Sequence, residues 1–304
     1  EEVQTHPILE QALLEGKTLL LPRVVAGCGD MTFWRVRDLE YDLRCEPPFG
    51  IPQPIPERCE PVSLAEASLV LVPGVAFDRC CNRLGRGKGY YDHALSQMRP
   101  KQVTVGLAFE DHVFREIPTT PNDIPVGLVV TEKYIYAHRS FTVTCDSPGA
   151  TEHLGFCLGS SLPSDKIVSL IAPLGSGKTV IVKGMVCARG GTVPATSPTY
   201  TLVNVYETQH QPFRHLDLFR WNSGKATEEN IEELLDILSE PGLIAVEWAD
   251  RAEEHLPMQS PCIRLVAGRE RHRVWQIETF LLEDSHWLDE CLCLISHKGL
   301  VSGI

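Results

Sequence analysis

The sequence predicts two consecutive α/β domains, each with three layers and a mostly parallel sheet. One observation is that short apolar runs of strand length alternate with segments of helical periodicity, a pattern typical of parallel sheets covered by helices. The alternation runs through the first 136 residues and restarts near residue 138. A second observation is that each half contains a glycine-rich loop between a predicted strand and a predicted helix.

The first half opens with a predicted helix over 5–15, where apolar residues recur at helical spacing and Gly16 suits the end. A buried strand is expected over 18–25. The proline-rich stretch 45–61 is interpreted as an irregular loop. The remaining elements expected in this half are strand 69–72, helix 90–98, strand 103–109 and strand 126–131.

The second half begins with a predicted strand over 141–145. Ser147 suits an N-cap and Pro148 the first position of a helix that ends near residue 161. The elements expected after it are strand 167–172, helix 179–188, strands 199–206 and 213–219, helix 227–239 and strand 243–246. The predicted domains are therefore 1–137 and 138–278.

The last segment, 279–304, is left unassigned as a tail without chemistry. One packed helical face is expected there, made of Leu281, Leu282, Leu288, Leu292 and Ile295.

Composition narrows the classes of function. The net charge of −12 makes a tight non-specific hold on nucleic acid improbable for this chain, because an acidic surface repels phosphate backbones. No apolar run approaches the roughly twenty residues that span a bilayer, and no secretory signal is visible. The eleven cysteines show no paired zinc-binding spacing. A cytoplasmic protein with buried, reduced thiols and no membrane partner is expected.

The loop of the first half points to a phosphate ligand. Its alternating glycines let backbone N–H groups approach an anion, and the following helix adds its positive end. The cations and glycines of this loop are Arg83, Gly85, Arg86, Gly87, Lys88 and Gly89. Asp92, one turn into the helix, is a candidate magnesium ligand. The alternative is a surface turn with solvated Arg and Lys.

Residues 71–95 resemble the signature of the 5-formyltetrahydrofolate cyclo-ligases, also called methenyltetrahydrofolate synthetases. Further matching segments are 2–5, 16–17, 21–23, 105–109, 122–123 and 130–132. The resemblance implies that ATP phosphorylates the formyl oxygen of 5-formyltetrahydrofolate. A folate nitrogen then closes on the activated carbon, which yields 5,10-methenyltetrahydrofolate, ADP and phosphate.

The same resemblance implies the roles of individual residues. Asp92 and Asp123 would ligate Mg²⁺, Glu2 would contact the folate, and Lys88 and Tyr91 would be catalytic. The implied ATP-binding residues are Arg83, Gly85, Arg86, Gly87, Lys88, Gly89, Tyr90 and Tyr91. The family carries a further segment ahead of the one that matches Glu2, so this half is expected to lack its N-terminal segment. Cys80-Cys81 stands where the family usually has glycine.

The loop of the second half has the context of a P-loop, which predicts a P-loop NTPase fold for the second domain. Lys178 would reach the β/γ-phosphate oxygens and Thr179 the Mg²⁺. The residues expected to bind ATP are Leu174, Gly175, Ser176, Gly177, Lys178 and Thr179. Ala172 stands where the strict pattern has glycine. If the loop requires a positive φ there, alanine would be strained by about 1 kcal/mol or more.

Two acids end later strands of the second half. Asp217 and Glu247 are candidates to hold Mg²⁺ or to orient the attacking water, because ligands bind beyond the carboxyl ends of parallel strands. A solvated strand end is the alternative for either acid. Residues 197–203 are a candidate phosphate-sensing segment. His215 is interpreted as a core or strand-end histidine, since no second ligand stands at metal-binding spacing.

Together these motifs resemble TsaE, the ATPase of bacterial tRNA threonylcarbamoyladenosine biosynthesis, over residues 140–278. The matching segments are 174–179, 197–203, 215–220 and 246–248. The resemblance implies ATP and Mg²⁺ as cofactors, with Thr179 and Glu247 at the metal. It also implies TsaB and TsaD as partners, and contact with tRNA only through them. Ala172 and Pro173 depart from the family pattern.

The sequence as a whole therefore predicts a bifunctional fusion of a folate cyclo-ligase with a tRNA-modification ATPase. An alternative of another class is a nucleotide-gated binding module for TsaB–TsaD that carries a degenerate, non-catalytic folate half.

Overall fold

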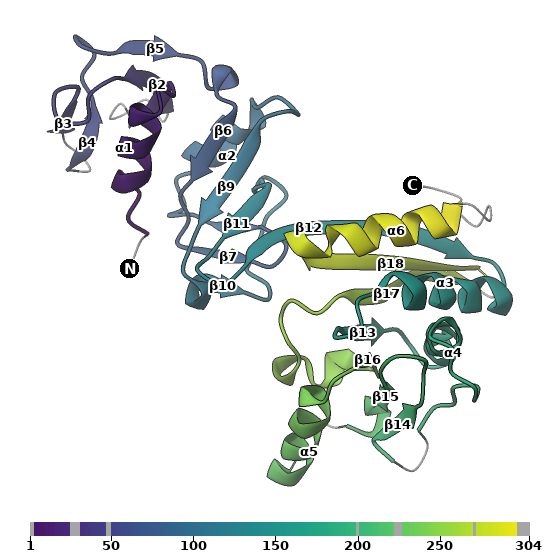
Figure 1. Cartoon of the computed structure of the whole chain (residues 1–304). Helices are drawn as coiled ribbons and strands as arrows, with labels where there is room; N and C mark the ends of the chain where they lie inside the picture. Colours follow the sequence, from purple (N-terminus) through teal and green to yellow (C-terminus); the bar gives the residue numbers. More distant parts are fainter. Residues whose placement is uncertain are drawn as a thin grey trace. The chain divides into compact units, whose positions relative to one another are not determined.

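A computed structural model of the chain describes residues 3–24, 31–46, 50–198, 201–221, 227–269 and 272–296. The chain divides into two compact units, Glu1–Ala137 and His138–Ile304 (Figure 1). Each unit combines helices with a sheet whose central strands are parallel, so the predicted α/β class is confirmed. In the described part of the chain, no helix is long and apolar enough to cross a membrane.

The beginning of the first unit is antiparallel. Helix α1 (His6–Leu14) is followed by Gly16 at φ 73°. A three-stranded sheet has the order β1-β2-β5, and its strands are β1 (Leu19–Val24), β2 (Met31–Val36) and β5 (Glu60–Val62). Strands β3 (Leu43–Glu46) and β4 (Ile51–Pro54) form a separate antiparallel pair.

These strands correct one expectation of the sequence analysis. The irregular loop predicted over 45–61 is wrong in part, because β4 and β5 lie within it. The prolines in β4 do not prevent pairing, since a strand of a two-stranded sheet has one free edge where no N–H is needed.

The centre of the first unit is parallel, as predicted. Strands β6 (Leu69–Val72), β9 (Val103–Leu107) and β11 (Leu128–Val130) pair in parallel, and α2 (Tyr90–Ser96) follows the glycine-rich loop. Strand β12 (Ile135–Cys145) pairs antiparallel with β11 through its first two residues. A small separate sheet has the order β10-β7-β8, from Val113–Phe114, Ala76–Asp78 and Arg83–Leu84.

The strands of the second unit follow the order β14-β15-β16-β13-β17-β18-β12. Their bounds are β14 Val203–Tyr206, β15 Phe213–Asp217, β16 Leu243–Glu247, β13 Ile167–Ile171, β17 Cys262–Arg269 and β18 His272–Leu281. The central four, β15, β16, β13 and β17, are parallel, whereas β14 and β18 run antiparallel to their neighbours β15 and β17. Strands β17 and β18 were not predicted from the sequence.

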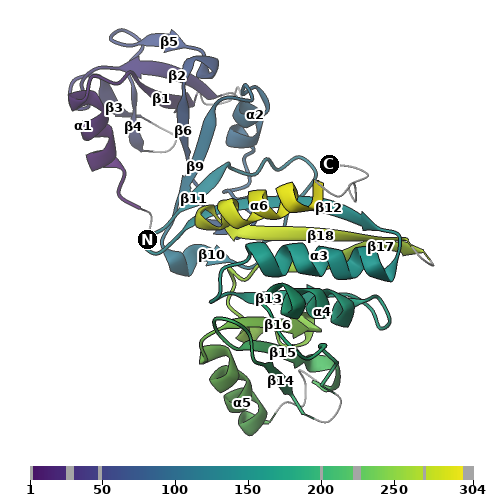
Figure 2. The same cartoon turned by 45° about the vertical axis from the view of Figure 1, so that its right-hand side comes forward.

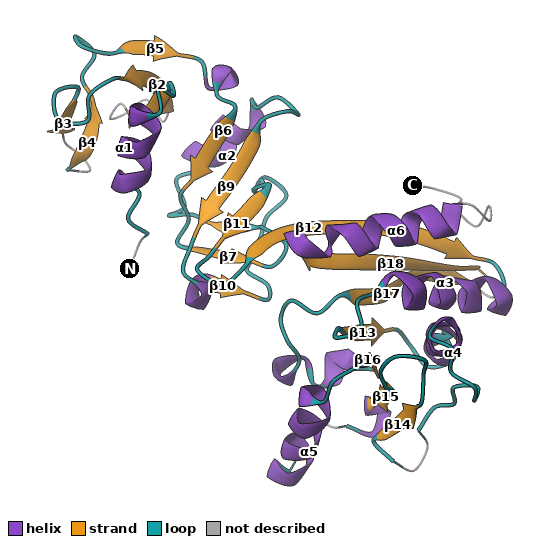
Figure 3. Ribbon diagram, viewed as in Figure 1, coloured by secondary structure: helices purple, strands orange, loops and turns teal. Residues whose placement is uncertain are grey.

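Helices cover both faces of this sheet and make three layers (Figures 2 and 3). Helices α3 (Pro148–Ser161), α4 (Lys178–Ala188) and α6 (Ser285–Ser296) share one apolar core with the sheet. Helix α5 (Glu228–Ser239) packs through Leu234 into a second core that contains Leu216 and Val246. The predicted cap of α3 is present, since Ser147 accepts from the Ala150 N–H. Helix α5 starts with a capping box at Thr227, which was not predicted.

Helices α3 and α4 approach each other closely through glycines. A Cβ at Gly155 of α3 would lie 2.0 Å from the Ile181 carbonyl oxygen, and one at Gly184 of α4 would lie 2.0 Å from the Glu152 carbonyl oxygen. No larger residue fits at either position without a shift of the backbone.

The C-terminal segment is part of the second unit rather than a loose tail. Leu288 and Ile295 of α6 are buried in the shared core, and Leu292 packs against it. The expected face is wrong for two of its members, because Leu281 ends β18 and Leu282 begins a 3₁₀ turn. A run of leucines does not by itself show where a strand ends and a helix begins.

Ten cysteines lie in the described residues, and all are free thiols. Six are buried, whereas Cys45, Cys187 and Cys293 are exposed, so the expected burial holds only in part. Burial raises the pKa of Cys145 to about 11 and that of Cys291 to about 12, which keeps both protonated at neutral pH.

A tight turn after β7 departs from ordinary backbone geometry. The buried Asp78 carboxylate accepts from the backbone N–H groups of Cys80, Asn82 and Ile117 and from the Asn82 side chain. These bonds hold Cys81 at φ 63°, in the left-handed region that favours glycine. The cysteine therefore occupies a position that glycine would adopt with less strain.

The strain at Cys81 can be tested with Cys81→Gly and Cys81→Ala. Both variants lose the thiol, but only alanine keeps a Cβ that opposes a left-handed φ. We expect the glycine variant to have the higher free energy of unfolding, by about 1 kcal/mol, in urea titrations of the full chain. The control is Ala67→Gly, where φ is −70° and glycine should destabilise. A glycine variant no more stable than the alanine variant at position 81 would contradict the assignment of strain.

Candidate functional site

A cavity of about 880 Å³ lies in the second unit, beyond the carboxyl ends of β13, β15 and β16. Its lining includes all six residues of the predicted P-loop together with both predicted acids. The lining residues used below are Leu174, Gly175, Ser176, Gly177, Lys178, Thr179, Ser197, Asp217, Phe219, Glu247 and Trp248. The sheet therefore brings together side chains that are up to 74 positions apart in the sequence, Leu174 and Trp248 being the most distant.

The predicted P-loop connects β13 to α4. Gly175 and Gly177 adopt φ values of 74° and 108°, so the two glycines make the turn that a side chain would oppose. The buried Ser176 hydroxyl has no hydrogen-bond partner among the described residues. A helix N-terminus, a glycine turn and an unpaired buried hydroxyl together fit an anionic phosphate ligand.

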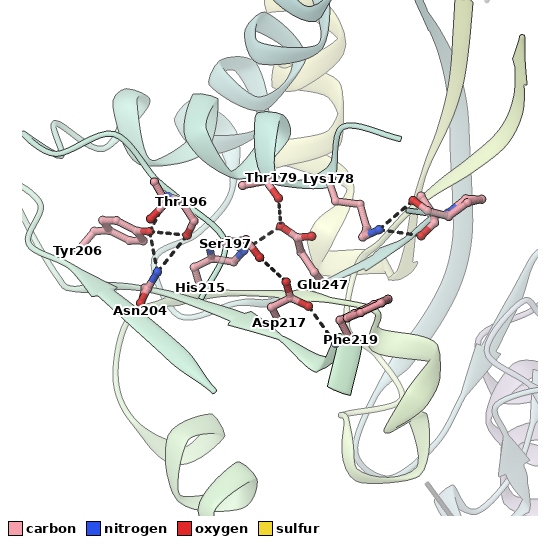
Figure 4. A network of polar contacts seen from close by, with 12 residues as sticks. Lys178, Thr179, Thr196, Ser197, Asn204, Tyr206, His215, Asp217, Phe219 and Glu247 are labelled. Atoms are coloured by element: carbon pink, nitrogen blue, oxygen red, sulfur yellow. Dashed lines mark hydrogen bonds and ion pairs between the residues drawn. The ribbon is translucent and has the colours of Figure 1, made fainter. Parts of the chain in front are cut away.

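Lys178 is held inside the loop that it is expected to serve. Its ammonium donates to the carbonyl oxygens of Ala172 at 2.8 Å and Pro173 at 3.0 Å, and lies 3.8 Å from the centre of the Trp248 ring (Figure 4). Burial lowers the pKa of Lys178, while the charges of Glu247 and Asp217 act in the opposite direction. Lys178 is only 4% exposed, so little of it contacts solvent.

The expected strain at Ala172 is wrong. Among the described non-glycine residues, only Cys81 and Trp248 have a positive φ. Ala172 is buried in the shared core, and its carbonyl accepts from Lys178. Because Gly175 and Gly177 make the turn, the position of Ala172 requires no glycine.

The two acids lie opposite each other on neighbouring parallel strands, Asp217 at the end of β15 and Glu247 at the end of β16. Glu247 Oε1 accepts from Thr179 Oγ1 at 2.7 Å and contacts His215 Nε2 at 2.9 Å. Asp217 accepts from the Ser197 hydroxyl and, at 2.9 Å, from the Phe219 N–H. The acids, Thr179 and the segment expected to sense phosphate therefore form one polar network (Figure 4).

This network suits a magnesium ion that retains most of its water. Within the described ranges, no three His, Cys, Asp or Glu side chains are grouped so that they could hold a metal by themselves. Mg²⁺ commonly takes only one or two protein ligands and completes its shell with water and phosphate. Thr179 and Glu247 are suitable donors for such a site.

An aromatic group at the cavity was not predicted from the sequence. Trp248 has a left-handed φ of 57°, and its ring lies 5.3 Å from the Phe219 ring, centre to centre. The guanidinium of Arg251 lies 4.6 Å from the centre of the Trp248 ring, which Lys178 also contacts. The position of Trp248 directly after Glu247 was a usable signal, whereas nothing in the sequence marked Arg251.

The loop of the first unit is open, as a ligand-binding loop would be. Gly87 and Gly89 have φ values of 74° and 69°, and no atom lies within 4 Å of a Cβ built on either. Arg86 and Lys88 are exposed, and Tyr90 and Tyr91 begin α2. Glu2 lies outside the described residues, as do Thr199 and Tyr200 of the segment expected to sense phosphate.

Arg83 differs from Arg86 and Lys88 because it is buried. Its Nη2 donates to both carboxylate oxygens of Asp92, each at 2.9 Å. The Ile124 N–H also points to Asp92, at 3.4 Å, which brings the Asp123 segment beside α2. Asp123 accepts from the Thr120 N–H at 2.6 Å. The two candidate metal ligands of the first unit are therefore both engaged in local hydrogen bonds.

Comparisons with known proteins divide the chain at the same place. Residues 1–132 match the model of the 5-formyltetrahydrofolate cyclo-ligase family, and residues 145–274 match that of the threonylcarbamoyl adenosine biosynthesis protein TsaE. A cyclo-ligase of Mus musculus is 33% identical over 139 residues, which are 43% of this chain and 68% of the relative. A TsaE protein of a Nostoc species is 34% identical over 134 residues, which are 43% of this chain and 81% of the relative.

Two solved structures also resemble parts of the chain. The crystal structure of Bacillus subtilis YdiB shares 20% identity at a TM-score of 0.42, covering 53% of this chain and 98% of that protein. A 5,10-methenyltetrahydrofolate synthetase from Mycoplasma pneumoniae shares 23% identity at a TM-score of 0.32, covering 42% of this chain and 65% of that protein. By its sequence relatives, the chain belongs to both the 5-formyltetrahydrofolate cyclo-ligase family and the TsaE family, as its motifs predicted.

The unstrained geometry of Ala172 leads to a direct test. We expect Ala172→Gly to leave ATP affinity and hydrolysis within about twofold of the unmodified chain, because no positive φ has to be relieved. The free energy of unfolding should fall by about 0.5–1 kcal/mol, since glycine is more flexible when unfolded. The matched variant is Gly177→Ala, which places a Cβ at φ 108° and should abolish nucleotide binding. Calorimetric titration and phosphate release measure these effects. Faster hydrolysis by Ala172→Gly would show that the loop is strained after all.

Proposed function

We propose that this chain, as a member of both families, is a bifunctional ATP-dependent enzyme. Its second unit binds and hydrolyses ATP as an accessory factor in tRNA threonylcarbamoyladenosine modification. Its first unit converts 5-formyltetrahydrofolate to 5,10-methenyltetrahydrofolate with ATP. The observation that carries the proposal is the cavity where the phosphate loop meets Thr179, Asp217 and Glu247.

Binding of ATP in the second unit would use the ammonium of Lys178. The carbonyl oxygens of Ala172 and Pro173 take two of its three N–H donors, which leaves one for a phosphate oxygen. That bond would join two charged groups, which makes it stronger than a bond to a carbonyl oxygen. The N–H groups of residues 175–179 and the Ser176 hydroxyl would complete the contacts to the phosphates.

Hydrolysis would depend on the two acids at the strand ends. Glu247 accepts a hydrogen bond from Thr179. Its carboxylate, or a water bound to it, could therefore act on the phosphate group that Thr179 and Mg²⁺ would hold. Mg²⁺ held near Thr179 and Glu247 would neutralise charge that develops on the phosphate oxygens. Asp217, which accepts from Ser197 and the Phe219 N–H, would orient the attacking water.

The first unit offers a comparable arrangement for the cyclo-ligase reaction. Arg86 and Lys88 are exposed and stand next to Gly87 and Gly89 in the chain. The space beside these two glycines is open, so ATP could approach the backbone there. Tyr91 would lie near the transferred group, and Asp92 and Asp123 would bind Mg²⁺. The Arg83 pair does not exclude a metal at Asp92, because an ionised carboxylate has about four acceptor sites. Glu2 is the proposed folate contact.

The partners follow from the same proposal. TsaB and TsaD are the expected protein partners of the second unit, and tRNA would be contacted only through them. The net charge of −12 supports an indirect contact, because an acidic chain is repelled by RNA phosphates. A cytoplasmic location is proposed for both activities.

The ATPase role is tested by Lys178→Met and Glu247→Gln in the full chain. Lys178→Met removes a charge from the phosphates, so both ATP affinity and hydrolysis should fall, affinity by about 10-fold or more. Glu247→Gln should reduce hydrolysis more than affinity, because its contribution is made chiefly in the transition state.

The matched control is Lys183→Met, on the same helix but outside the cavity, where Lys183 pairs with Glu152. Affinity comes from calorimetry and hydrolysis from phosphate release, each with and without TsaB and TsaD. If Lys178→Met binds and hydrolyses ATP normally, the P-loop assignment fails. If the unmodified chain binds ATP and both partners but never hydrolyses ATP, the second unit is a nucleotide-gated binding module instead.

The cyclo-ligase role is tested by Lys88→Ala in a chain that also carries Lys178→Met, which silences nucleotide binding by the second unit. Removal of the Lys88 charge should weaken the remaining ATP binding by about 10-fold or more and slow formation of methenyltetrahydrofolate, followed by absorbance. Lys133→Ala, another exposed lysine of the first unit, serves as the control. Unchanged affinity in a folded Lys88→Ala chain would remove this loop from the ATP site.

A further inference from the structure

His215 is the most deeply buried titratable group beside the proposed ATPase site, with no exposed surface at all. It lies in β15 opposite Ala245 of β16, two residues before the position where Asp217 faces Glu247. This register places the imidazole diagonally across from Glu247, and Nε2 lies 2.9 Å from Glu247 Oε1 (Figure 4). The other ring nitrogen, Nδ1, is buried and has no partner among the described residues.

The contacts of the two nitrogens place a hydrogen on Nε2. A ring with hydrogen on Nε2 donates to the carboxylate. The tautomer with hydrogen on Nδ1 alone would face the carboxylate with a lone pair at 2.9 Å and would bury an unpaired N–H group. His215 therefore donates from Nε2 to Glu247.

Glu247 then receives two donors of different kinds on the same oxygen. The Thr179 hydroxyl can rotate, and it could ligate a metal ion through a lone pair while its hydrogen stays on Glu247, so its position depends on what occupies the site. The imidazole is enclosed by the core and has no other partner among the described residues. Of the two bonds, the one from His215 is therefore independent of the ligand state of the site.

Stability alone does not account for this histidine. A buried imidazole with one unpaired nitrogen is less favourable than an apolar side chain of similar size, and the neighbouring Leu216 and Phe213 are apolar and buried. What His215 adds is a rigid donor aimed at the carboxylate that the proposed function uses.

We propose that His215 is a positioning residue of the ATPase site: its Nε2–H fixes the orientation of the Glu247 carboxylate during hydrolysis. The proposal rests on the ATPase function proposed above for the second unit. It assigns His215 no direct contact with the nucleotide, so its removal should affect turnover and leave binding intact.

Two substitutions distinguish the two ring nitrogens. The amide nitrogen of glutamine reaches about as far as Nε2, whereas that of asparagine reaches only the position of Nδ1. We expect His215→Asn to lower kcat by about 10–100-fold, the usual effect of losing a group that orients a metal-site ligand. ATP affinity should change by less than about twofold. His215→Gln should restore most of kcat, because it returns a donor to Glu247.

The control is another histidine–glutamate contact of this unit, between His138 Nε2 and Glu278 Oε1 at 3.2 Å, which lies outside the cavity lining. His138→Asn removes an equivalent contact and should leave kcat unchanged. Thermal unfolding of every variant separates a loss of folding from a loss of turnover. Equal loss of kcat in folded His215→Gln and His215→Asn chains would overturn the proposal, as would normal turnover by folded His215→Asn.

A spectroscopic measurement decides the tautomer without any activity. In the full chain with ¹⁵N-labelled histidine, the His215 signals are those that vanish in His215→Gln. We expect hydrogen on Nε2, and a ring with hydrogen on Nδ1 alone would overturn the proposal. If the unmodified chain hydrolyses no ATP with or without its partners, the proposed ATPase function fails. The tautomer measurement then still decides whether His215 donates to Glu247.

Discussion

The second unit is organised around one buried carboxylate. Glu247 is 3% exposed and receives the hydroxyl of Thr179 from the start of α4 and the imidazole of His215 from β15. A carboxylate removed from water is destabilising unless it is hydrogen-bonded, and Thr179 and His215 both donate to this one. The bonds therefore tie the phosphate-loop helix to two parallel strands. The cavity owes its shape to this connection, since all three segments line it or lie directly behind it.

The position of Lys178 also follows from burial. Because little solvent reaches the ammonium, it contacts two carbonyl oxygens of the loop and the face of Trp248. The loop therefore surrounds the ammonium. The buried Ser176 hydroxyl has no partner among the described residues. The first unit solves the problem differently: Arg83 is neutralised by Asp92, and the remaining cations of its loop stay exposed.

Periodicity and caps predicted most helices and parallel strands, because those signals lie within a dozen residues of sequence. Glu247 was singled out for the same reason, since it directly follows the apolar run 243–246, and the two loops were singled out by their glycines. Strands β17 and β18 were missed, since their pairing includes a bulge between Leu265 and Ala267 and their pattern is irregular. Local pattern also failed where the tertiary structure decides the outcome. It could not show that Ala172 has an ordinary φ, that His215 contacts Glu247, or that Arg251 lies over Trp248.

The glycine contacts between α3 and α4 have a mechanical consequence. Backbone rests on backbone at Gly155 and Gly184, and the first turn of α3 reaches the phosphate loop, where Thr151 Cγ2 would lie 3.4 Å from a Cβ on Gly177. Helix α4 therefore cannot slide along α3 or rotate against it without a clash between carbonyl oxygens and the neighbouring helix. The base of the predicted phosphate loop is therefore fixed by backbone contact. A change in the shape of the cavity would fall on its other lining segments, those that carry Ser197 and Phe219.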